Sequence, residues 1–351
     1  MTPLSFGSSL EVMEIPAAAR GAALQRTVAA ARTGDPRAIG RLLSLVENTD
    51  PVCDDAPLQA LWSAFPRPLA CGYVLGVTGA PGVGKSTLVA ALIAAFRRDG
   101  MRVGVLAVDP SSPFTGGALL GDRIRMHAHT TDPGVFLRSM AARGHLGGLA
   151  PATPMAIRLL EALGFDVVLV ETVGVGQGEI AVARAVDTTL VVTAPGLGDA
   201  VQAAKAGVLE IADIFVANKA DHPGADQTVR ELRQTLAVES SGPDGWRRPV
   251  VRTVATRGDI DELVDAVRRH RDRLAQGGGR DRRRRRAADD VRALVFRHYA
   301  GRLTEVMTGA EFDALADRVA AGELDLLTAV RAVLADTRAA VARAVSPPAT
   351  S

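Results

Sequence analysis

Cysteine is nearly absent from this sequence, which removes two kinds of site from consideration. Cys53 and Cys71 are the two cysteines in 351 residues, so neither a disulfide framework nor a zinc site with paired cysteines is expected. No apolar run reaches the roughly 18 residues of a membrane span, and Met1–Ile15 lacks the basic-then-apolar pattern of a signal peptide. These absences predict a protein of the reducing cytoplasm without a membrane segment.

Lysine is almost as scarce. Lysine and arginine together number 41, and Lys85, Lys205 and Lys219 are the three lysines, which leaves 38 arginines. In a chain that uses arginine so heavily, a remaining lysine marks a place where a planar guanidinium cannot replace a compact ammonium. Each lysine is therefore a candidate functional residue. The formal net charge is +2, which argues against a nucleic-acid-binding protein.

The remaining composition is that of a folded globular protein. Hydrophobic residues make up 47% and charged residues 23% of the chain, which predicts one large domain with extensions. We expect an N-terminal helical extension at 1–70, the main domain at 71–275, and a C-terminal helical arm with a disordered tail at 276–351. Asp35-Pro36 indicates a helix start in the extension, ahead of an apolar stripe formed by Ile39, Leu42, Leu43 and Val46.

The main domain alternates short apolar runs with amphipathic stretches. This alternation predicts an α/β fold with a mostly parallel sheet covered by helices on both faces. The expected strands are Tyr73–Thr78, Arg102–Val108, Asp166–Val170, Thr188–Thr193, Ile214–Ala217 and Pro249–Val254.

The C-terminal arm begins with two unusual segments. Gly277–Gly279 indicates a hinge, and Arg282–Arg286 is a run of five arginines. That run is interpreted as a solvated basic helix start, with a nucleic-acid or anion patch as the alternative. Further along, apolar residues at helical spacing give the arm a face that either packs on the core or forms a dimer.

One motif is specific for phosphate binding. It is the run Gly79-Ala80-Pro81-Gly82-Val83-Gly84-Lys85-Ser86-Thr87, which follows an expected strand and opens an expected helix. Backbone N–H groups of such a loop surround the phosphates of a nucleotide. Lys85 is expected to reach the β- and γ-phosphates, and the Ser86 hydroxyl to ligate Mg²⁺.

A second motif predicts that the base is guanine. Asn218-Lys219-Ala220-Asp221 follows the expected strand Ile214–Ala217. The Asp221 carboxylate can accept both N1–H and the exocyclic amine of guanine, whereas adenine would leave it unpaired. Ala255-Thr256-Arg257 is interpreted either as a base-side loop or as an ordinary strand-to-helix turn capped by Asp259.

Three carboxylates are expected on the ligand side of the sheet. Asp109 and Glu171 follow the apolar runs of two expected strands, and Asp122 closes the Pro- and Gly-rich loop between them. They can hold Mg²⁺ or orient the attacking water. For Asp109 and Asp122, turn capping is the alternative. Lys205 is interpreted as a switch or transition-state residue, with a surface lysine as the alternative.

Taken together, these motifs resemble the MeaB/ArgK/MMAA family of G-protein chaperones associated with methylmalonyl-CoA mutase. The loop Asp109-Pro-Ser-Ser-Pro-Phe-Thr-Gly-Gly117, followed by Leu120-Gly-Asp-Arg123, is similar to a loop of that family. The segment Glu171-Thr-Val-Gly-Val-Gly-Gln177 is similar to its second switch, where most G proteins carry Asp instead of Glu. The chain departs from the family at Gly178 and Ala255, where Ser is usual.

The resemblance implies a phosphate-loop GTPase core with an N-terminal helical extension and a C-terminal helical dimerisation arm. It implies slow hydrolysis of GTP with Mg²⁺, in a homodimer that assists an adenosylcobalamin-dependent acyl-CoA mutase. The assistance consists of gating cofactor loading and protecting or rescuing the mutase. On the matching positions, Lys85 and Ser86 hold phosphates and Mg²⁺, and Asp221 fixes guanine. Asp109, Asp122 and Glu171 form the metal and water shell. Gln202 and Lys205 belong to a switch that responds to the mutase.

Two alternative functions are weighed against this interpretation. A GTPase that delivers nickel would need a cluster of cysteine and histidine, and two separated cysteines do not supply one. A non-catalytic assembly scaffold would use GTP as a structural ligand, and measured turnover in the presence of the partner distinguishes it from an enzyme.

Overall fold

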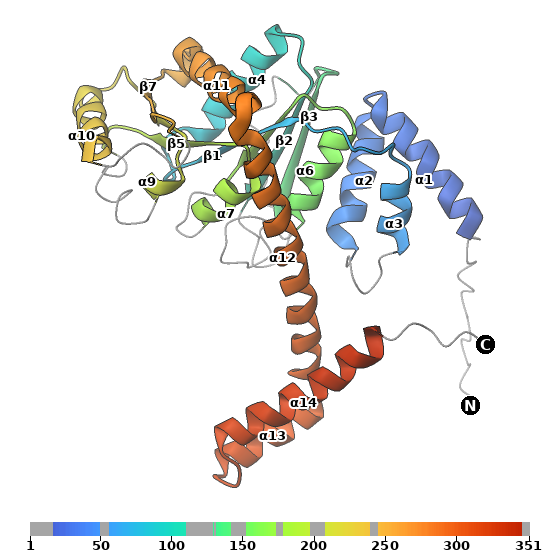
Figure 1. The fold of residues 1–351 in the computed structure, drawn as a ribbon. Coiled ribbons are helices and arrows are strands. Elements are labelled where there is room, and N and C mark those ends of the chain that lie inside the picture. The colour runs from blue at the N-terminus through green and yellow to red at the C-terminus, as the bar shows by residue number, and fades with distance from the viewer. Residues whose placement is uncertain are drawn as a thin grey trace, which may run out of the picture. The chain divides into compact units, whose positions relative to one another are not determined.

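The computed structural model describes residues 17–49, 56–109, 129, 131–141, 152–172, 178–196, 208–238 and 245–345 (Figure 1). The chain divides into two compact units. The first comprises residues up to Thr49 together with Asp55–Arg282, and the second includes the chain from Arg283 onward. The described helices include none that is both long and apolar enough to cross a membrane.

A seven-stranded sheet forms the centre of the first unit, in the order β3-β2-β4-β1-β5-β6-β7. All neighbouring strands pair in parallel, which confirms the predicted α/β class. The strands are β1 (Tyr73–Thr78), β2 (Val103–Asp109), β3 (Val135–Ala141), β4 (Val167–Glu171), β5 (Thr188–Thr193), β6 (Ile214–Ala217) and β7 (Val250–Arg252).

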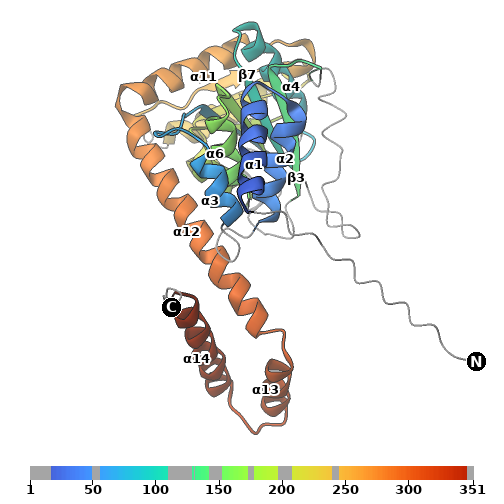
Figure 2. The same ribbon diagram turned by 90° about the vertical axis from the view of Figure 1, so that its right-hand side faces the viewer.

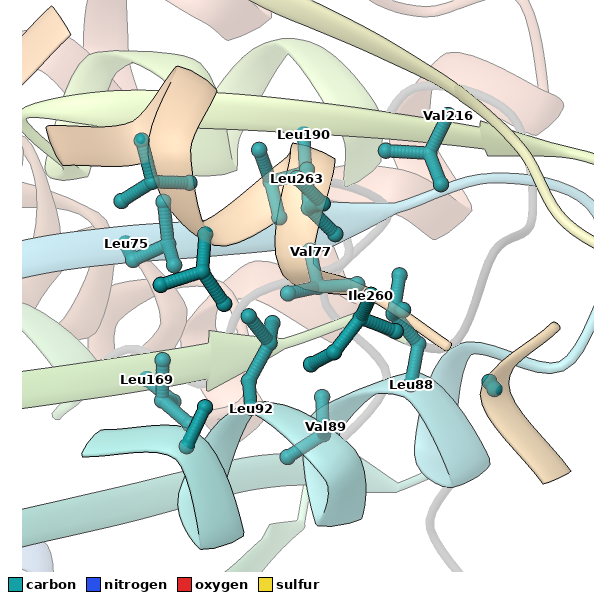
Figure 3. Packing of buried hydrophobic residues seen from close by; sticks show 14 of the residues in the cluster. Leu75, Val77, Leu88, Val89, Leu92, Leu169, Leu190, Val216, Ile260 and Leu263 are labelled. Atoms are coloured by element: carbon teal, nitrogen blue, oxygen red, sulfur yellow. The ribbon is translucent and has the colours of Figure 1, made fainter. Parts of the chain in front are cut away.

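Helices cover both faces of this sheet. They are α4 (Lys85–Arg98), α6 (Thr153–Ala162), α7 (Gly178–Ala185), α9 (Val208–Ile211), α10 (Ala225–Val238) and α11 (Asp261–Arg273). On one face, side chains of α4 and α11 bury Leu75 and Val77 of β1 in a single hydrophobic cluster (Figure 3). On the other face α7 packs against β1, since a Cβ at Gly76 would meet the side chains of Val182 and Val186. Continuous burial explains why β1 is an uninterrupted apolar run.

Strand β3 is the one the sequence analysis missed. It pairs only with β2, at the edge of the sheet, and its sequence carries Arg138 and Ser139 among apolar residues. An edge strand needs no continuous apolar run, because part of it faces polar neighbours. Here Arg138 binds the Glu47 carboxylate and donates to the Ser44 hydroxyl at 3.0 Å, which joins the edge to an N-terminal helix.

Among the described residues, three helices precede the sheet: α1 (Ala17–Arg32), α2 (Pro36–Asn48) and α3 (Ala56–Ser63). They group on the β3 side of the sheet (Figures 1 and 2). The predicted start of α2 is confirmed, because the Asp35 side chain accepts the Arg37 N–H at 2.8 Å and Pro36 is the first helical residue. The predicted apolar stripe is also buried, at Ile39, Leu42, Leu43 and Val46.

Carboxylates fasten the starts of three strands to their neighbours. Asp166, Asp187 and Asp213 directly precede β4, β5 and β6. Their side chains accept backbone N–H groups of the adjacent chain segment, from Arg102 at 2.7 Å, Val74 at 2.9 Å and Thr189 at 2.8 Å respectively. Each carboxylate therefore satisfies a donor that the parallel ladder leaves at the edge opposite the carboxyl ends of the strands.

Asp213 has a second role, which involves the first arginine of the five-arginine run. Arg282 donates to both Asp213 oxygens, at 2.9 and 2.7 Å, and the two side chains are only 19% and 13% exposed. His270 lies 3.5 Å from the same carboxylate and 2.6 Å from the Thr188 hydroxyl. The interpretation of the run as a solvated helix start is therefore wrong for Arg282, because a largely buried bidentate ion pair holds it. It is also wrong for Arg286, which is only 3% exposed.

Replacing Asp213 with alanine should cost about 3 kcal/mol of unfolding free energy, because it removes the largely buried carboxylate to which the Arg282 guanidinium and the Thr189 N–H both donate. Urea unfolding measures this loss. Asp272→Ala, at an exposed position of α11, is the matched control and should change stability by less than about 0.5 kcal/mol. Equal unfolding midpoints for the two variants would contradict the structural role of Asp213.

The second unit is helical. It contains most of α12 (Gly279–Val306), followed by α13 (Ala310–Ala320) and α14 (Leu326–Val345). Residues Leu274–Gly278 connect α11 to α12 as a π-helical turn in which Gly277 leaves helical geometry, at φ 164° and ψ −38°. Large apolar side chains are exposed on α12 and α14, with Phe296 73% and Leu327 71% exposed; the others are Val291, Val295, Tyr299, Leu326, Val330 and Leu334.

Candidate functional site

The phosphate-binding motif forms the turn between β1 and α4. Gly79–Gly84 make the loop, and Lys85, Ser86 and Thr87 are the first residues of the helix. Gly79, Gly82 and Gly84 have φ values of 142°, 81° and 97°, a region that side-chain-bearing residues rarely adopt. The first N–H groups of α4 consequently point toward the space enclosed by the loop, where an anion is favoured.

Lys85 is held by the loop itself. Its Nζ donates to the carbonyl oxygens of Gly79 at 2.9 Å and Ala80 at 3.1 Å, and the residue is 8% exposed. Ala80, Pro81 and Val83 complete the turn around it. The ammonium is thus fixed against the loop carbonyls, where it can neutralise charge on a bound phosphate chain.

Ser86 and Glu171 bring a hydroxyl and a carboxylate together. The Ser86 hydroxyl donates to Glu171 Oε1 at 2.7 Å, and the residues are 5% and 2% exposed. Glu171 is the last residue of β4, which pairs directly with β1. Two buried hard oxygen ligands at the phosphate loop are the donor set that Mg²⁺ prefers, so these residues fit the metal.

The other predicted metal and switch residues are less completely described. Asp109 is the last residue of β2, the neighbour of β4 on the far side from β1. It therefore ends at the same edge of the sheet as Glu171, although its side chain is not described. Asp122, Gln202 and Lys205 lie outside the described residues, so their predicted roles stay predictions.

The guanine motif is bonded to the phosphate loop. Asn218 donates from Nδ2 to the Val83 carbonyl at 2.9 Å, and Lys219 donates from Nζ to the Gly82 carbonyl at 2.9 Å. Lys219 reaches that carbonyl from a left-handed backbone conformation, at φ 56°. Gly84 must be glycine here, since a Cβ would lie 2.5 Å from Asn218 Nδ2. The two motifs, 135 residues apart, form one structural feature.

The Ala255–Arg257 segment also joins this feature. It is a short 3₁₀ turn after β7, and the Asn218 amide oxygen accepts the Ala255 N–H at 3.2 Å and the Thr253 hydroxyl at 3.1 Å. Thr256 is exposed in the same turn. The segment is a turn between β7 and α11, but the predicted cap by Asp259 is wrong, because α11 has Ile260 at its N-cap and no side-chain cap. Its contact with a base stays a prediction.

Arg257 of this turn forms an ion pair with Asp221. Their side chains approach to 3.3 Å between Nη2 and Oδ2, with Asp221 28% exposed. The carboxylate that sequence analysis assigns to guanine therefore remains accessible, next to a positive charge. Sequence reasoning did not identify Thr253, whose hydroxyl donates to the Asn218 side chain. This bond exists only in the folded sheet, so no local sequence pattern predicts it.

Comparison with known proteins gives consistent results. The sequence model of one protein family, described as methylmalonyl-CoA mutase-associated GTPase MeaB, matches residues 39–308. A Pyrococcus abyssi protein named as a GTPase is 48% identical over 307 residues, which cover 86% of this chain and 93% of the relative. The GTPase ArgK of Escherichia coli is 38% identical over 252 residues, covering 70% and 75%.

A solved structure extends the similarity to three dimensions. The crystal structure of a LAO/AO transport system kinase superposes with a TM-score of 0.66 at 26% sequence identity, and the match covers 90% of this chain and 98% of that one.

Proposed function

This chain belongs to the MeaB family of methylmalonyl-CoA mutase-associated GTPases, and we propose that it is a cytoplasmic GTPase that assists an adenosylcobalamin-dependent acyl-CoA mutase. It would gate cofactor loading and protect or reactivate the mutase. The observation that carries this proposal is the family match over residues 39–308 together with a phosphate loop and guanine motif bonded into one site. GTP hydrolysis itself follows from the family and the fold.

The residues suit in-line attack of water on the γ-phosphate. Catalysis of this kind depends on positioning and on neutralising the charge that spreads over the phosphoryl oxygens. Lys85 and the N–H groups at the start of α4 would supply positive charge. Ser86 and Glu171 would hold Mg²⁺ with Asp109 and Asp122, and the metal, when bound, would neutralise charge on the β- and γ-oxygens. Asp221 would select guanine, supported by Asn218, Lys219 and the Ala255-Thr256-Arg257 turn.

Substituting Asp221 with asparagine should change which base is accepted. We expect GTP affinity to fall about 100-fold, because the carboxamide can accept the N1–H of guanine but presents a donor to its exocyclic amine. Xanthosine triphosphate should bind better to the variant, since xanthine carries a carbonyl where guanine carries that amine. Titration with fluorescent guanine and xanthine nucleotides measures both affinities.

Asp226→Asn is the control for this experiment. Asp226 is a 68% exposed side chain on α10 paired with Arg252, and exposed pairs contribute little, so its nucleotide affinities should match those of the unsubstituted protein. If Asp221→Asn kept its preference for GTP over the xanthine nucleotide, Asp221 would not be the residue that reads the base.

A homodimer is part of the proposal. Its support is the row of exposed apolar side chains on α12 and α14, including Phe296 and Leu327, because soluble proteins seldom leave such faces uncovered. Sedimentation analysis of the full chain should show a dimer that Leu327→Glu weakens. A monomer at all concentrations tested would rule this part out.

The main test is GTP hydrolysis with and without a cobalamin-dependent acyl-CoA mutase, with ATP as the nucleotide control. We expect slow GTP turnover alone and faster turnover with the mutase. Lys205→Ala should bind GTP normally and lose most of the stimulation, if Lys205 is placed only when the partner docks.

The outcomes separate the alternatives. Guanine-specific turnover that no mutase stimulates would keep the GTPase and reject the mutase partner. Absence of turnover even with the mutase would favour a scaffold that uses GTP as a structural ligand. Full stimulation of Lys205→Ala would remove Lys205 from the coupling.

A further inference from the structure

A cavity of about 350 Å³ lies in the first unit, away from the nucleotide site. Its walls come from the end of α1, from the connection between α3 and β1, and from the end of α6. Arg102, one of its lining residues, immediately precedes β2. Because all strands are parallel, the cavity is at the strand-start edge of the sheet, and the phosphate loop is at the opposite edge.

The cavity combines apolar walls with two arginines. Phe65, Leu69, Ala162 and Leu163 are apolar lining residues, and Arg32 and Arg102 are basic ones. This mixture of a mainly apolar lining with a few polar groups, at the lower end of the usual volume range, is typical of small-molecule sites.

Arg102 is held in place without a carboxylate. Its Nη1 donates to the carbonyl oxygens of Leu163 at 3.0 Å and Gly164 at 3.3 Å, and its guanidinium lies 4.6 Å from the centre of the Phe165 ring. The adjacent Asp166 accepts the backbone N–H of Arg102, and no ion pair to the guanidinium occurs among the described residues. A guanidinium that is fixed in position and has further N–H donors can bind an anion with little loss of side-chain entropy.

Arg32 adds a second positive charge to the same cavity. It is the last residue of α1 and is exposed, and it too forms no ion pair within the described part of the chain. Both arginines line the same cavity, and a bound anion would compensate their like charges. The two positive charges therefore match an anionic group of a ligand, and the apolar lining residues match an apolar part of the same ligand.

We propose that this cavity binds a small carboxylate with an apolar chain. A planar carboxylate matches a guanidinium through two parallel hydrogen bonds, while the chain contacts the apolar walls. An inorganic anion would leave those walls without a partner, and a neutral apolar molecule would leave the two charges uncompensated. The site is independent of the nucleotide, because no lining residue belongs to either nucleotide motif.

Octanoate is the probe, and octanamide is its neutral counterpart of the same shape. Binding is followed by protein-detected NMR on the full chain saturated with GDP. We expect octanoate to bind saturably with a dissociation constant in the low millimolar range, as the size of the ligand allows, and octanamide to bind about fivefold more weakly.

Two variants locate the binding. Arg32→Gln should weaken octanoate about fivefold, whereas Arg26→Gln, an exposed arginine of the same helix outside the cavity, should leave it unchanged. Ala70→Glu places a carboxylate at an exposed lining position and should abolish binding of octanoate. Thermal unfolding checks that each variant folds.

Several results would overturn the proposal. Equal affinity for octanoate and octanamide would reduce the cavity to an apolar site. Equal octanoate affinities of Arg32→Gln and Arg26→Gln would show that the charge of Arg32 does not hold the carboxylate. Octanoate binding that occurs in the nucleotide-free protein and disappears once GDP saturates it would place octanoate in the nucleotide site, and absence of saturable binding to the GDP-saturated chain would reject the proposed site altogether.

Discussion

Replacing Lys85 with alanine is expected to lower GTP turnover by about a thousandfold, because the variant loses the ammonium that the phosphate loop holds in a buried position. The ammonium already lies within 2.9 and 3.1 Å of two loop carbonyls in an 8% exposed position. It therefore needs little rearrangement to meet a phosphate. Single-turnover hydrolysis at saturating GTP measures the chemical step apart from weakened binding.

Lys85→Arg tests whether the shape of the cation matters. We expect turnover almost as low as in the alanine variant, because a planar guanidinium is too large for a position enclosed by the loop. Arg98→Ala, at the exposed far end of the same helix, is the control and should hydrolyse GTP normally. Full activity of Lys85→Arg would contradict the argument from lysine scarcity, because arginine would then have been acceptable there.

Substituting Gly79 with alanine should abolish nucleotide binding. A Cβ at this position would lie 2.1 Å from the carbonyl oxygen of Val192 in β5, and that atom belongs to a buried strand that cannot move aside. The residue also has a φ of 142°, which a side chain makes unfavourable. The start of the phosphate loop must therefore shift away from the sheet. Calorimetric titration with GDP measures the loss.

Gly100→Ala separates the two causes. Gly100 has a φ of 76° with no atom within 4 Å of an added Cβ, so this variant carries conformational strain without a clash. We expect it to lose about 1 kcal/mol of stability and to bind GDP normally. Normal GDP binding by Gly79→Ala would show that the loop tolerates the displacement.

The sequence predicted the parts of this structure that depend on local pattern. Strands β1, β5 and β6 begin and end where the apolar runs do, because strands buried on both faces must be apolar throughout. The edge strand β3 escaped prediction, since Arg138 interrupts its apolar pattern in order to meet Glu47. In the same way, the five arginines gave no sign that Arg282 would meet Asp213, which lies 69 residues away.

In the candidate site, too, the sequence predicted the local motifs and not the contacts between distant segments. Glycine and lysine spacing identified the phosphate loop and the guanine motif, since each is set within a few residues of chain. The bonds from Asn218 to Val83 and from Thr253 to Asn218 depend on which strands become neighbours, and spacing carries no such information. One sequence signal could have predicted more of the structure: an aspartate directly precedes each of three strands, at 166, 187 and 213.

The hydrogen bonds between the phosphate loop and the guanine loop bear on the entropy of binding. Asn218 and Lys219 hold the carbonyls of Val83 and Gly82 before any ligand contact is considered. A nucleotide that touches both loops therefore does not have to order them relative to each other, and little conformational freedom is lost there when it binds. The affinity gained from the base and the affinity gained from the phosphates can then add almost fully, as for two groups joined on a rigid frame.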